Sequence, residues 1–320
     1  MQQNRRNFLK SATALTGSAL FVTGQNIFPQ TVAQTVRSAR QVEVFINQYS
    51  VRHYYDREGI SLMGNIDHCF AELKESGLAG FEAMANQPED LDIFIDALKK
   101  HNMLLRSFYT GANFHDEAVA EAEIKRVIAL AERTKDVGTK VVVLNPQPKS
   151  GKSDAELNRQ NQNLNILGGE LRKSGMKLAL HYHTAELEFA AREFHSFMCD
   201  TDPENVSLCY DAHWSFRGSN NSAVSAYSHA KLYADRIAEL HLRQSQNGIW
   251  TETFVARADL DYSKILAILH QRKGFGDYHI VLEQIPESET PSTLKPLDIF
   301  RRSVETVKKM YESLEQVIVK

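Results

Sequence analysis

Eight short runs of apolar and β-branched residues recur along this chain, and their repetition restricts the fold more than any other feature. They lie at residues 41–46, 78–83, 103–108, 140–144, 176–182, 206–211, 236–242 and 278–283. Each run has the length and composition of a buried β-strand, and the intervals are long enough for a helix and two loops. Strands that alternate with helices favour a parallel sheet, because a parallel connection needs a crossover of about a dozen residues or more.

Helical periodicity fills most of these intervals, and no hairpin signal interrupts the alternation. Apolar residues recur with helical spacing in 66–73, 91–98, 118–131, 157–171, 265–269 and 300–314. Eight strand–helix units predict a sheet that closes on itself, so we expect an α/β protein with the (β/α)8 architecture of a TIM barrel, as a single domain over residues 34–320. An open doubly wound sheet would need a glycine-rich turn after its first strand, whereas Gln48–Val51 follow Asn47 here.

The first 33 residues have the features of an export signal rather than of a barrel. Arg5 and Arg6 stand in a twin-arginine signature, and a weakly apolar run from Ala12 to Val22 follows them. That run is too short and too rich in Ser, Thr and Gly for a membrane anchor, which needs roughly 20 apolar residues. We therefore predict a twin-arginine signal peptide over residues 1–33 and a periplasmic location.

The composition argues against a polyanionic partner. Apolar residues make up 42% of the chain and charged residues 24%, and the formal net charge is −3. A nucleic-acid-binding domain normally carries a cationic balance or a basic stripe. The composition therefore favours a small-molecule substrate over a nucleic acid.

Ionisable side chains stand at the carboxyl ends of four consecutive predicted strands. They are His181 and His183 on the fifth strand, Asp211 and His213 on the sixth, His241 on the seventh and Glu283 on the eighth. The carboxyl ends of barrel strands meet at one mouth, where barrel enzymes have their active sites. Imidazole nitrogens and carboxylate oxygens together suit one divalent ion, Mn, Co, Zn or Mg.

These residues also have interpretations without a metal. The two histidines of the fifth strand could be rim residues that bond to each other, and Asp211 could cap the helix that follows its strand. A lone carboxylate inside a barrel carries a large desolvation penalty, so Glu283 needs either a cation or an arginine. Arg243, two residues after His241, is the candidate arginine.

Other residues at strand ends have the chemistry to bind a carbohydrate. The predicted substrate-binding residues are Glu82, Asn145, His213, Trp214 and Arg243. Carboxylate and amide groups bind hydroxyls, and an indole ring such as that of Trp214 packs on the C–H face of a sugar. Trp250 lies in the long loop from Gln244 to Ala258, where it could close over the mouth or form a contact in a homo-oligomer.

From Lys177 to Gln284 the strand ends resemble those of the xylose-isomerase-like barrel superfamily, which includes sugar phosphate isomerases/epimerases and AP endonuclease relatives. The resemblance implies metal ligands at the ends of strands five to eight, which here are His181, Asp211, His241 and Glu283. Many members have Glu at the first of these positions. One branch carries His-Asn-His-Asp-x-Glu-Phe there, which is similar to the run from His181 to Glu186, so Glu186 is an alternative fourth ligand. The usual His-x-Lys-Asp reads His241-Leu242-Arg243-Gln244 here, so its carboxylate is absent.

The resemblance implies an enzyme that moves a proton on a carbohydrate. A divalent ion that chelates two adjacent substrate oxygens stabilises the enediolate formed when a neighbouring C–H loses its proton. Glu283, Glu186 and His183 are the candidate catalytic acid and base. We predict a metal-dependent isomerase or epimerase of a free sugar or keto-sugar. A phosphorylated sugar would need a basic cluster at a strand end to bind its phosphate, and the nearest one, Lys149–Lys152, lies in a predicted solvated turn. A lyase or dehydratase acting on a keto-glycoside or inosose, and a non-catalytic sugar-binding barrel, would use the same residues.

Overall fold

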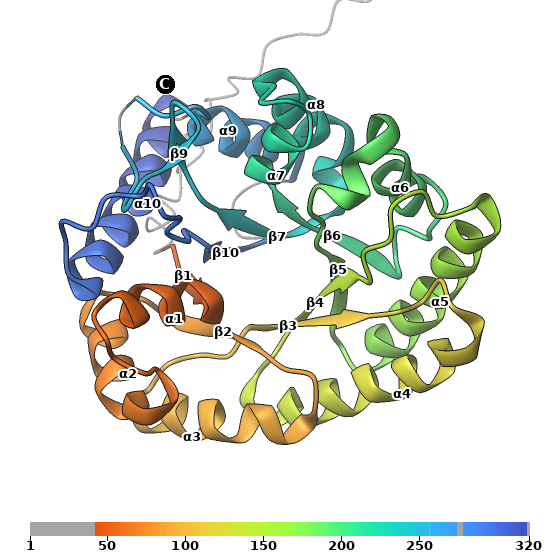
Figure 1. Ribbon diagram of the computed structural model, residues 1–320, viewed down its shortest axis with the longest axis horizontal. Helices are drawn as coiled ribbons and strands as arrows, with labels where there is room; N and C mark the ends of the chain where they lie inside the picture. The colour runs from red at the N-terminus through yellow and green to blue at the C-terminus, as the bar shows by residue number, and fades with distance from the viewer. Residues whose placement is uncertain (1–41, 256, 274–277, 319–320) are drawn as a thin grey trace, which may run out of the picture. The chain divides into compact units, whose positions relative to one another are not determined.

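The computed structural model describes residues 42–255, 257–273 and 278–318, which are built around a closed barrel of eight parallel strands (Figure 1). The strands are β1 (Val44–Asn47), β2 (Gly80–Met84), β3 (Ser107–Ala112), β4 (Val141–Pro146), β5 (Lys177–Leu180), β6 (Val206–Asp211), β7 (Ile237–Leu242) and β10 (His279–Leu282). They follow one another around the barrel in chain order, and β10 pairs with β1 to close it. Each predicted strand overlaps one of these eight, so the predicted TIM-barrel fold is confirmed.

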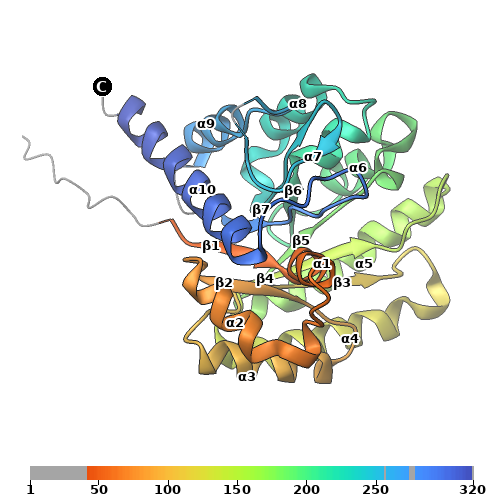
Figure 2. The same ribbon diagram turned by 60° about the vertical axis from the view of Figure 1, so that its left-hand side comes forward.

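Helices connect successive strands and surround the barrel, as a second view makes clear (Figure 2). The α-helices are α1 (Gln48–Arg57), α2 (Ile66–Glu75), α3 (Asp92–Lys100), α4 (Glu117–Thr134), α5 (Asp154–Lys173), α6 (Glu188–Cys199), α7 (Ala212–Arg217), α8 (Ala223–Tyr233), α9 (Tyr262–Lys273) and α10 (Pro296–Ile318). Short 3₁₀ helices are η1 (Met63–Asn65), η2 (Pro88–Leu91), η3 (Lys135–Val137), η4 (Ala185–Leu187) and η5 (Ala234–Arg236). All six predicted helical segments are helical. The sequence pattern missed α1, α6, α7 and α8, where polar and aromatic residues interrupt the apolar stripe.

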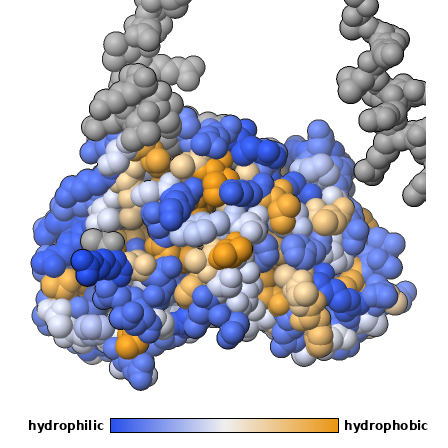
Figure 3. All heavy atoms as spheres, turned by 90° about the horizontal axis from the view of Figure 1, so that it is seen from above, coloured by the Kyte–Doolittle hydropathy of each residue, from blue (hydrophilic) through white to orange (hydrophobic). Residues whose placement is uncertain are grey.

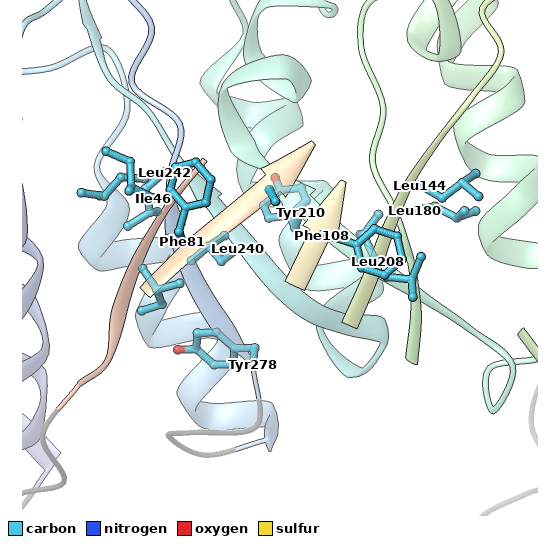
Figure 4. Packing of buried hydrophobic residues seen from close by; sticks show 14 of the residues in the cluster. Ile46, Phe81, Phe108, Leu144, Leu180, Leu208, Tyr210, Leu240, Leu242 and Tyr278 are labelled. Carbon is cyan, nitrogen blue, oxygen red and sulfur yellow. The ribbon is translucent and has the colours of Figure 1, made fainter. Parts of the chain in front are cut away.

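Alternation along the strands separates two sets of side chains. One set packs outward against the helices and belongs to the main apolar core; Ile46, Phe81, Phe108, Leu180 and Leu240 are examples (Figure 4). The other set faces the barrel axis, where a small apolar cluster contains Val141, Val143, Ala179, Cys209 and Ala238. The remaining inward positions toward the carboxyl ends carry polar side chains. The strand alternation therefore directs chemistry to the inside and core packing to the outside.

One hairpin lies outside the barrel, which corrects the expectation of an uninterrupted alternation. Strands β8 (Ser245–Gln246) and β9 (Ile249–Trp250) pair antiparallel in the loop after β7. Asn247 and Gly248 both have positive φ, at 54° and 80°, which is the conformation that favours Asn-Gly in two-residue hairpin turns. Trp250 is only 3% exposed, so its ring packs against the protein; its two predicted roles, closure over the mouth or a contact in a homo-oligomer, stay predictions.

The molecular surface shows no dominant apolar face in the view from above (Figure 3). There, apolar side chains form small patches between hydrophilic ones, an arrangement that is common on protein surfaces. Among the helices that the structure describes, none combines the length and apolarity required to cross a bilayer. The predicted signal peptide, residues 1–33, lies outside the described residues.

Candidate functional site

The four predicted metal ligands meet at the carboxyl ends of β5, β6, β7 and β10. His181 Nε2 lies 3.9 Å from Asp211 Oδ2 and 3.7 Å from Glu283 Oε2. His241 Nδ1 lies 3.0 Å from the same Glu283 oxygen. One nitrogen of His181, one of His241 and one oxygen of Glu283 are all within 4.8 Å of one another. The convergence that the sequence predicted is therefore present.

A β-bulge brings Asp211 and His241 side by side. Leu208 of β6 pairs with Ile237, but Cys209 pairs with Glu239, so β7 carries one extra residue at this point. Beyond the bulge Asp211 is directly opposite His241. A bulge of this kind turns two consecutive residues toward the same face, which is why both Ala238 and Glu239 lie inside the barrel.

His241 is held between carboxylates on both of its ring nitrogens. Nδ1 faces Glu283, while Nε2 lies 3.2 Å from Glu82 Oε2 and 3.1 Å from Glu239 Oε1. Burial opposes a charged imidazole here, but the Cys209, Glu82 and Glu283 side chains outweigh it and raise the pKa of His241 well above its usual range. Burial in turn raises the pKa of Glu82 to about 8.

Arg243 bridges two of the predicted ligands. Its Nε lies 2.8 Å from Asp211 Oδ2, and its Nη2 donates to Glu283 Oε2. The guanidinium also lies over two indole rings, 5.1 Å from the centre of Trp214 and 5.4 Å from that of Trp250. Although burial acts against it, the Arg243 charge together with His241 holds the pKa of Glu283 well below its usual range. The arginine partner that the sequence offered for Glu283 is therefore present as well.

Asp211 serves two purposes with its two oxygens. Oδ1 accepts hydrogen bonds from the backbone N–H groups of His213 and Trp214, at 2.8 and 3.0 Å, and so caps α7. Oδ2 points toward His181 and Arg243. The cap and the metal-ligand interpretations are therefore compatible, because the cap fixes the side chain that presents the second oxygen.

Helix α7 explains why one predicted residue lies elsewhere. The strand alternation that would have kept His213 beside Asp211 ends when the helix begins at Ala212. His213 Nε2 instead lies 2.9 Å from Ser245 Oγ, and its ring packs 4.3 Å from that of Trp250. His213 therefore contacts the β8–β9 hairpin through Nε2, while its Nδ1 is buried without a hydrogen bond within the described residues, and its predicted contact with substrate stays a prediction.

The three catalytic candidates have different surroundings. His183 lies next to the ligands, with its ring 4.8 Å from that of His181 and 4.9 Å from that of Trp214, and burial lowers its pKa to about 3. Glu283 is part of the ligand set. Glu186 accepts a hydrogen bond from the His183 backbone N–H, and the nearest charges that act on it are Glu193 and Lys152. The structure thus brings His183 and Glu283 together and places the Glu186 carboxylate beside a separate ion pair.

The remaining predicted substrate contacts differ in whether their polar atoms are already bonded to protein groups. Glu82 is fully buried and bonds Asn47, Ser107 and the deeper nitrogen of His241, so its oxygens are already engaged by protein groups. Asn145 has the inward parity of Val143, and its Oδ1 is buried without a hydrogen-bond partner among the described residues. Trp214 likewise keeps its indole N–H free of any hydrogen bond recorded in this part of the chain. Asn145 and Trp214 are therefore available to a ligand.

Two residues of the site escaped the sequence prediction. Tyr109 of β3 lies with its hydroxyl 3.3 Å from His181 Nδ1, and Asn47 both caps α1 and bonds Glu82. The signal for Tyr109 was its parity with Ser107, which places both inside the barrel. An aromatic residue in the middle of a strand is usually core, so parity alone did not identify it.

The donor set fits a divalent metal ion. His181 Nε2 is buried and makes no hydrogen bond to any described residue, whereas Asp211 Oδ2, also buried, is met by the Arg243 guanidinium without a well-aligned hydrogen bond. Orphaned buried polar atoms are rare in proteins and often mark an ion or water position. With His241 and Glu283 they would provide two nitrogens and two oxygens, a combination that suits Mn, Co or Zn. Tyr109 would orient His181 from behind, as is common for metal-binding imidazoles.

Comparisons with known proteins agree with this architecture. Residues 70–310 match the family described as xylose isomerase-like TIM barrel. An inosose dehydratase from Clostridium perfringens is 23% identical over 268 residues, which cover 74% of this chain and 88% of that protein. The solved structure of an L-ribulose 3-epimerase is similar with a TM-score of 0.66 and 15% identity, and the match covers 87% of this chain and 97% of that one. A xylose isomerase-like TIM barrel protein from Mycobacterium smegmatis in complex with magnesium has a TM-score of 0.59 and 12% identity, over 86% and 97% of the two chains.

Proposed function

Because this chain belongs to the xylose isomerase-like TIM barrel family, we propose that it is a divalent-metal-dependent sugar isomerase or epimerase that acts on a free sugar or keto-sugar. The observation that carries the proposal is the convergence of His181, Asp211, His241 and Glu283 at the barrel mouth, with two of their donor atoms lacking hydrogen bonds within the described residues. Magnesium in one structural relative and the epimerase name of another support it.

The charges inside the barrel give the proposal a second support. The carboxylates of Glu82, Asp211, Glu239 and Glu283 are between 0 and 5% exposed. The cations within hydrogen-bond distance of them are His241 and Arg243. Buried charge that lacks compensation is very costly, so four carboxylates facing two cations require protons or a further positive charge. Glu82, whose pKa burial raises to about 8, can hold one of these protons, and a divalent ion would supply the rest of the positive charge.

The chemistry follows from what the surrounding groups do. When bound, a divalent ion polarises a substrate carbonyl and stabilises the negative charge that develops when the adjacent C–H is deprotonated. His183 is held neutral by burial, so beside the ligands it would act as a proton acceptor. Glu283 is held ionised by Arg243 and His241 and is the candidate base on the other side. Trp214 and Asn145 would orient the sugar through its C–H face and a hydroxyl.

A dehydratase is the second candidate, and the similarity to inosose dehydratase favours it. Elimination of water starts with the same removal of a proton next to a carbonyl, so the same groups serve it. The two activities differ in what leaves after that step: an epimerase or isomerase returns a proton to carbon, whereas a dehydratase expels a hydroxyl. A keto-glycoside lyase would expel a sugar instead. The predicted periplasmic location agrees with an unphosphorylated substrate and remains a proposal.

Hydrogen exchange in heavy water tests the shared step. The protein would be incubated with Mn²⁺ and a panel of ketoses, keto-glycosides and inososes, and each would be followed by mass spectrometry. We expect deuterium uptake at a carbon next to the carbonyl, or loss of water, with at least one compound. Asp211→Ala should lose bound Mn²⁺ and fall at least about 100-fold in rate, because even outer partners of a metal ligand cost 10- to 100-fold. Binding of a sugar without exchange or elimination would instead identify a non-catalytic binding barrel.

A further inference from the structure

Arg243 and the proposed ion need the same two oxygens. Its guanidinium contacts Asp211 Oδ2 and Glu283 Oε2, and these are the oxygens that lie 3.9 and 3.7 Å from His181 Nε2. A divalent ion bound to His181, Asp211 and Glu283 would share these two oxygens with the guanidinium, and like charges repel strongly in a buried site. Each oxygen has two lone pairs, so it is this repulsion that disfavours the guanidinium and the ion on the same two oxygens.

We propose that Arg243 is a built-in competitor of the metal ion, which pairs with Asp211 and Glu283 until the ion binds and then gives up these oxygens and remains on the Trp214 ring, where it becomes a substrate contact. The inference rests on the proposed metal site and adds the order in which the ion and the substrate bind. The ion binds first, and the arginine reaches substrate oxygen only afterwards.

The two tryptophan rings can stabilise the guanidinium after it gives up the carboxylate oxygens. Both rings already lie within cation–π range of the guanidinium, and such contacts stabilise a desolvated cation by about 0.5–2 kcal/mol. The Arg217 guanidinium already lies 3.8 Å from the centre of the Trp250 ring, so Trp214 is the ring on which a displaced Arg243 would rest. Trp214 borders His183 at the mouth, so an arginine that moved onto it would remain next to the reacting groups.

The present contacts of Arg243 are close but not ideal. Nε lies 2.8 Å from Asp211 Oδ2, yet both atoms are among those without a well-formed hydrogen bond in the described structure. The ion pair therefore depends on charge more than on alignment, and a metal ion that coordinates Oδ2 directly can replace it. His181 Nε2, which the arginine leaves without a partner, becomes satisfied only in the ion-bound state.

Arg217 offers a matched control for Arg243. Both arginines lie over Trp250, but Arg217 pairs with Glu287 and touches none of the proposed ligands. Mn²⁺ binding would be measured by calorimetry on the wild-type protein, Arg243→Gln, Arg243→Lys and Arg217→Gln. Removing a competitor raises the fraction of protein ready to bind, so we expect Arg243→Gln to bind Mn²⁺ about tenfold more tightly or better. Arg243→Lys should tighten binding less, and Arg217→Gln should leave it within about twofold of wild type.

Tighter binding separates competition from damage, because a disturbed fold weakens metal binding. Equal or weaker Mn²⁺ binding by Arg243→Gln, with normal binding by the wild type, would overturn the inference and leave the proposed function standing. Failure of every protein, wild type included, to bind Mn²⁺ would overturn both.

A second measurement needs no variant to fold. The chain has two tryptophans, and both flank Arg243. Titration of the wild-type protein with Zn²⁺, which does not quench through unpaired electrons, should change the tryptophan emission with the same midpoint as calorimetric Zn²⁺ binding. Zn²⁺ that binds without any change in emission would show that the guanidinium stays in place, and would contradict the proposal.

Discussion

The two halves of the barrel wall share one fold and differ in what they present to the axis. In the half formed by β1 to β4 the inner face carries Phe45, Tyr109, Val141 and Val143, with Glu82 as its carboxylate. In the half formed by β5, β6, β7 and β10 the inner face carries His181, Asp211, Glu239, His241, Arg243 and Glu283. The outer faces of both halves are mainly apolar. The difference shows that the core packing lies on the outside of the wall, whereas the buried ionisable groups gather on the inside of one half.

Truncation of an outer residue in the first half should have the largest effect, and on stability alone. Phe108 of β3 is fully buried against the helices. Phe108→Ala should lower the free energy of unfolding by about 3–5 kcal/mol, because it leaves a cavity as well as losing apolar burial. Urea denaturation measures the loss, and calorimetry should find Mn²⁺ affinity within about twofold of wild type at a temperature where the variant is folded. A parallel loss of Mn²⁺ affinity would show that the two faces of the wall are not independent.

Acid should destabilise the second half through histidines that are buried behind its wall. Burial lowers the pKa of His213 to about 3 and that of His229, which is bonded to Ser215, to about 4. These values lie below the unfolded pKa of about 6.5, so the unfolded chain takes up protons first as the pH falls. The stability is therefore fully present above about pH 6.5 and is lost toward about pH 4, by up to about 1.4 kcal/mol per pH unit for each histidine.

The histidine contribution can be isolated with one substitution. His229→Gln keeps a polar side chain near Ser215 but removes the titrating group. Urea denaturation between about pH 6.5 and pH 4 should show a slope smaller by one proton than in wild type. An unchanged slope would place the acid sensitivity elsewhere, for example in the carboxylates around His241.

The smallest effect should come from the contact that joins the two halves. The Tyr109 hydroxyl lies 3.3 Å from His181 Nδ1, which is a long hydrogen bond. Tyr109→Phe should weaken Mn²⁺ binding about tenfold, at the low end for loss of an orienting partner of a metal ligand. Its effect on urea denaturation should stay below about 1 kcal/mol. If this variant bound Mn²⁺ as tightly as wild type, the Tyr109 hydroxyl would not be needed to orient the His181 ring.

The sequence predicted the wall more completely than the surroundings of the site. Alternating apolar runs identify every barrel strand, because strand identity depends on local composition. The convergence of His181, Asp211, His241 and Glu283 also followed, since parity and strand order together place the ends of parallel strands. Tyr109 was missed for the opposite reason. Its role depends on its contact with His181 on another strand. The local sequence pattern around Tyr109 carries no information about that contact.

The direction of side chains beyond the strands was the least predictable part. The His213 ring points to the β8–β9 hairpin because Asp211 caps a helix that begins at Ala212. Trp250 is buried because Asn247 and Gly248 form the turn of that hairpin. Both outcomes follow from turn and cap chemistry at one or two residues, which can redirect every side chain after them. Arg243 is a different case. The sequence left two partners open for Glu283, Arg243 or a metal ion, and the position of Arg243 allows either partner to pair with Glu283.

The extra residue in β7 opposite Leu208 and Cys209 sets a rule for recombining this protein with its relatives. The register between the sixth and seventh strands shifts by that residue, so either strand transplanted alone into a relative without the bulge would be paired one residue out of register. Leu240 and Leu242 would then turn toward the axis and His241 toward the helices. Crossover points in chimaeras should therefore fall before β6 or after β7, so that the pair is inherited together.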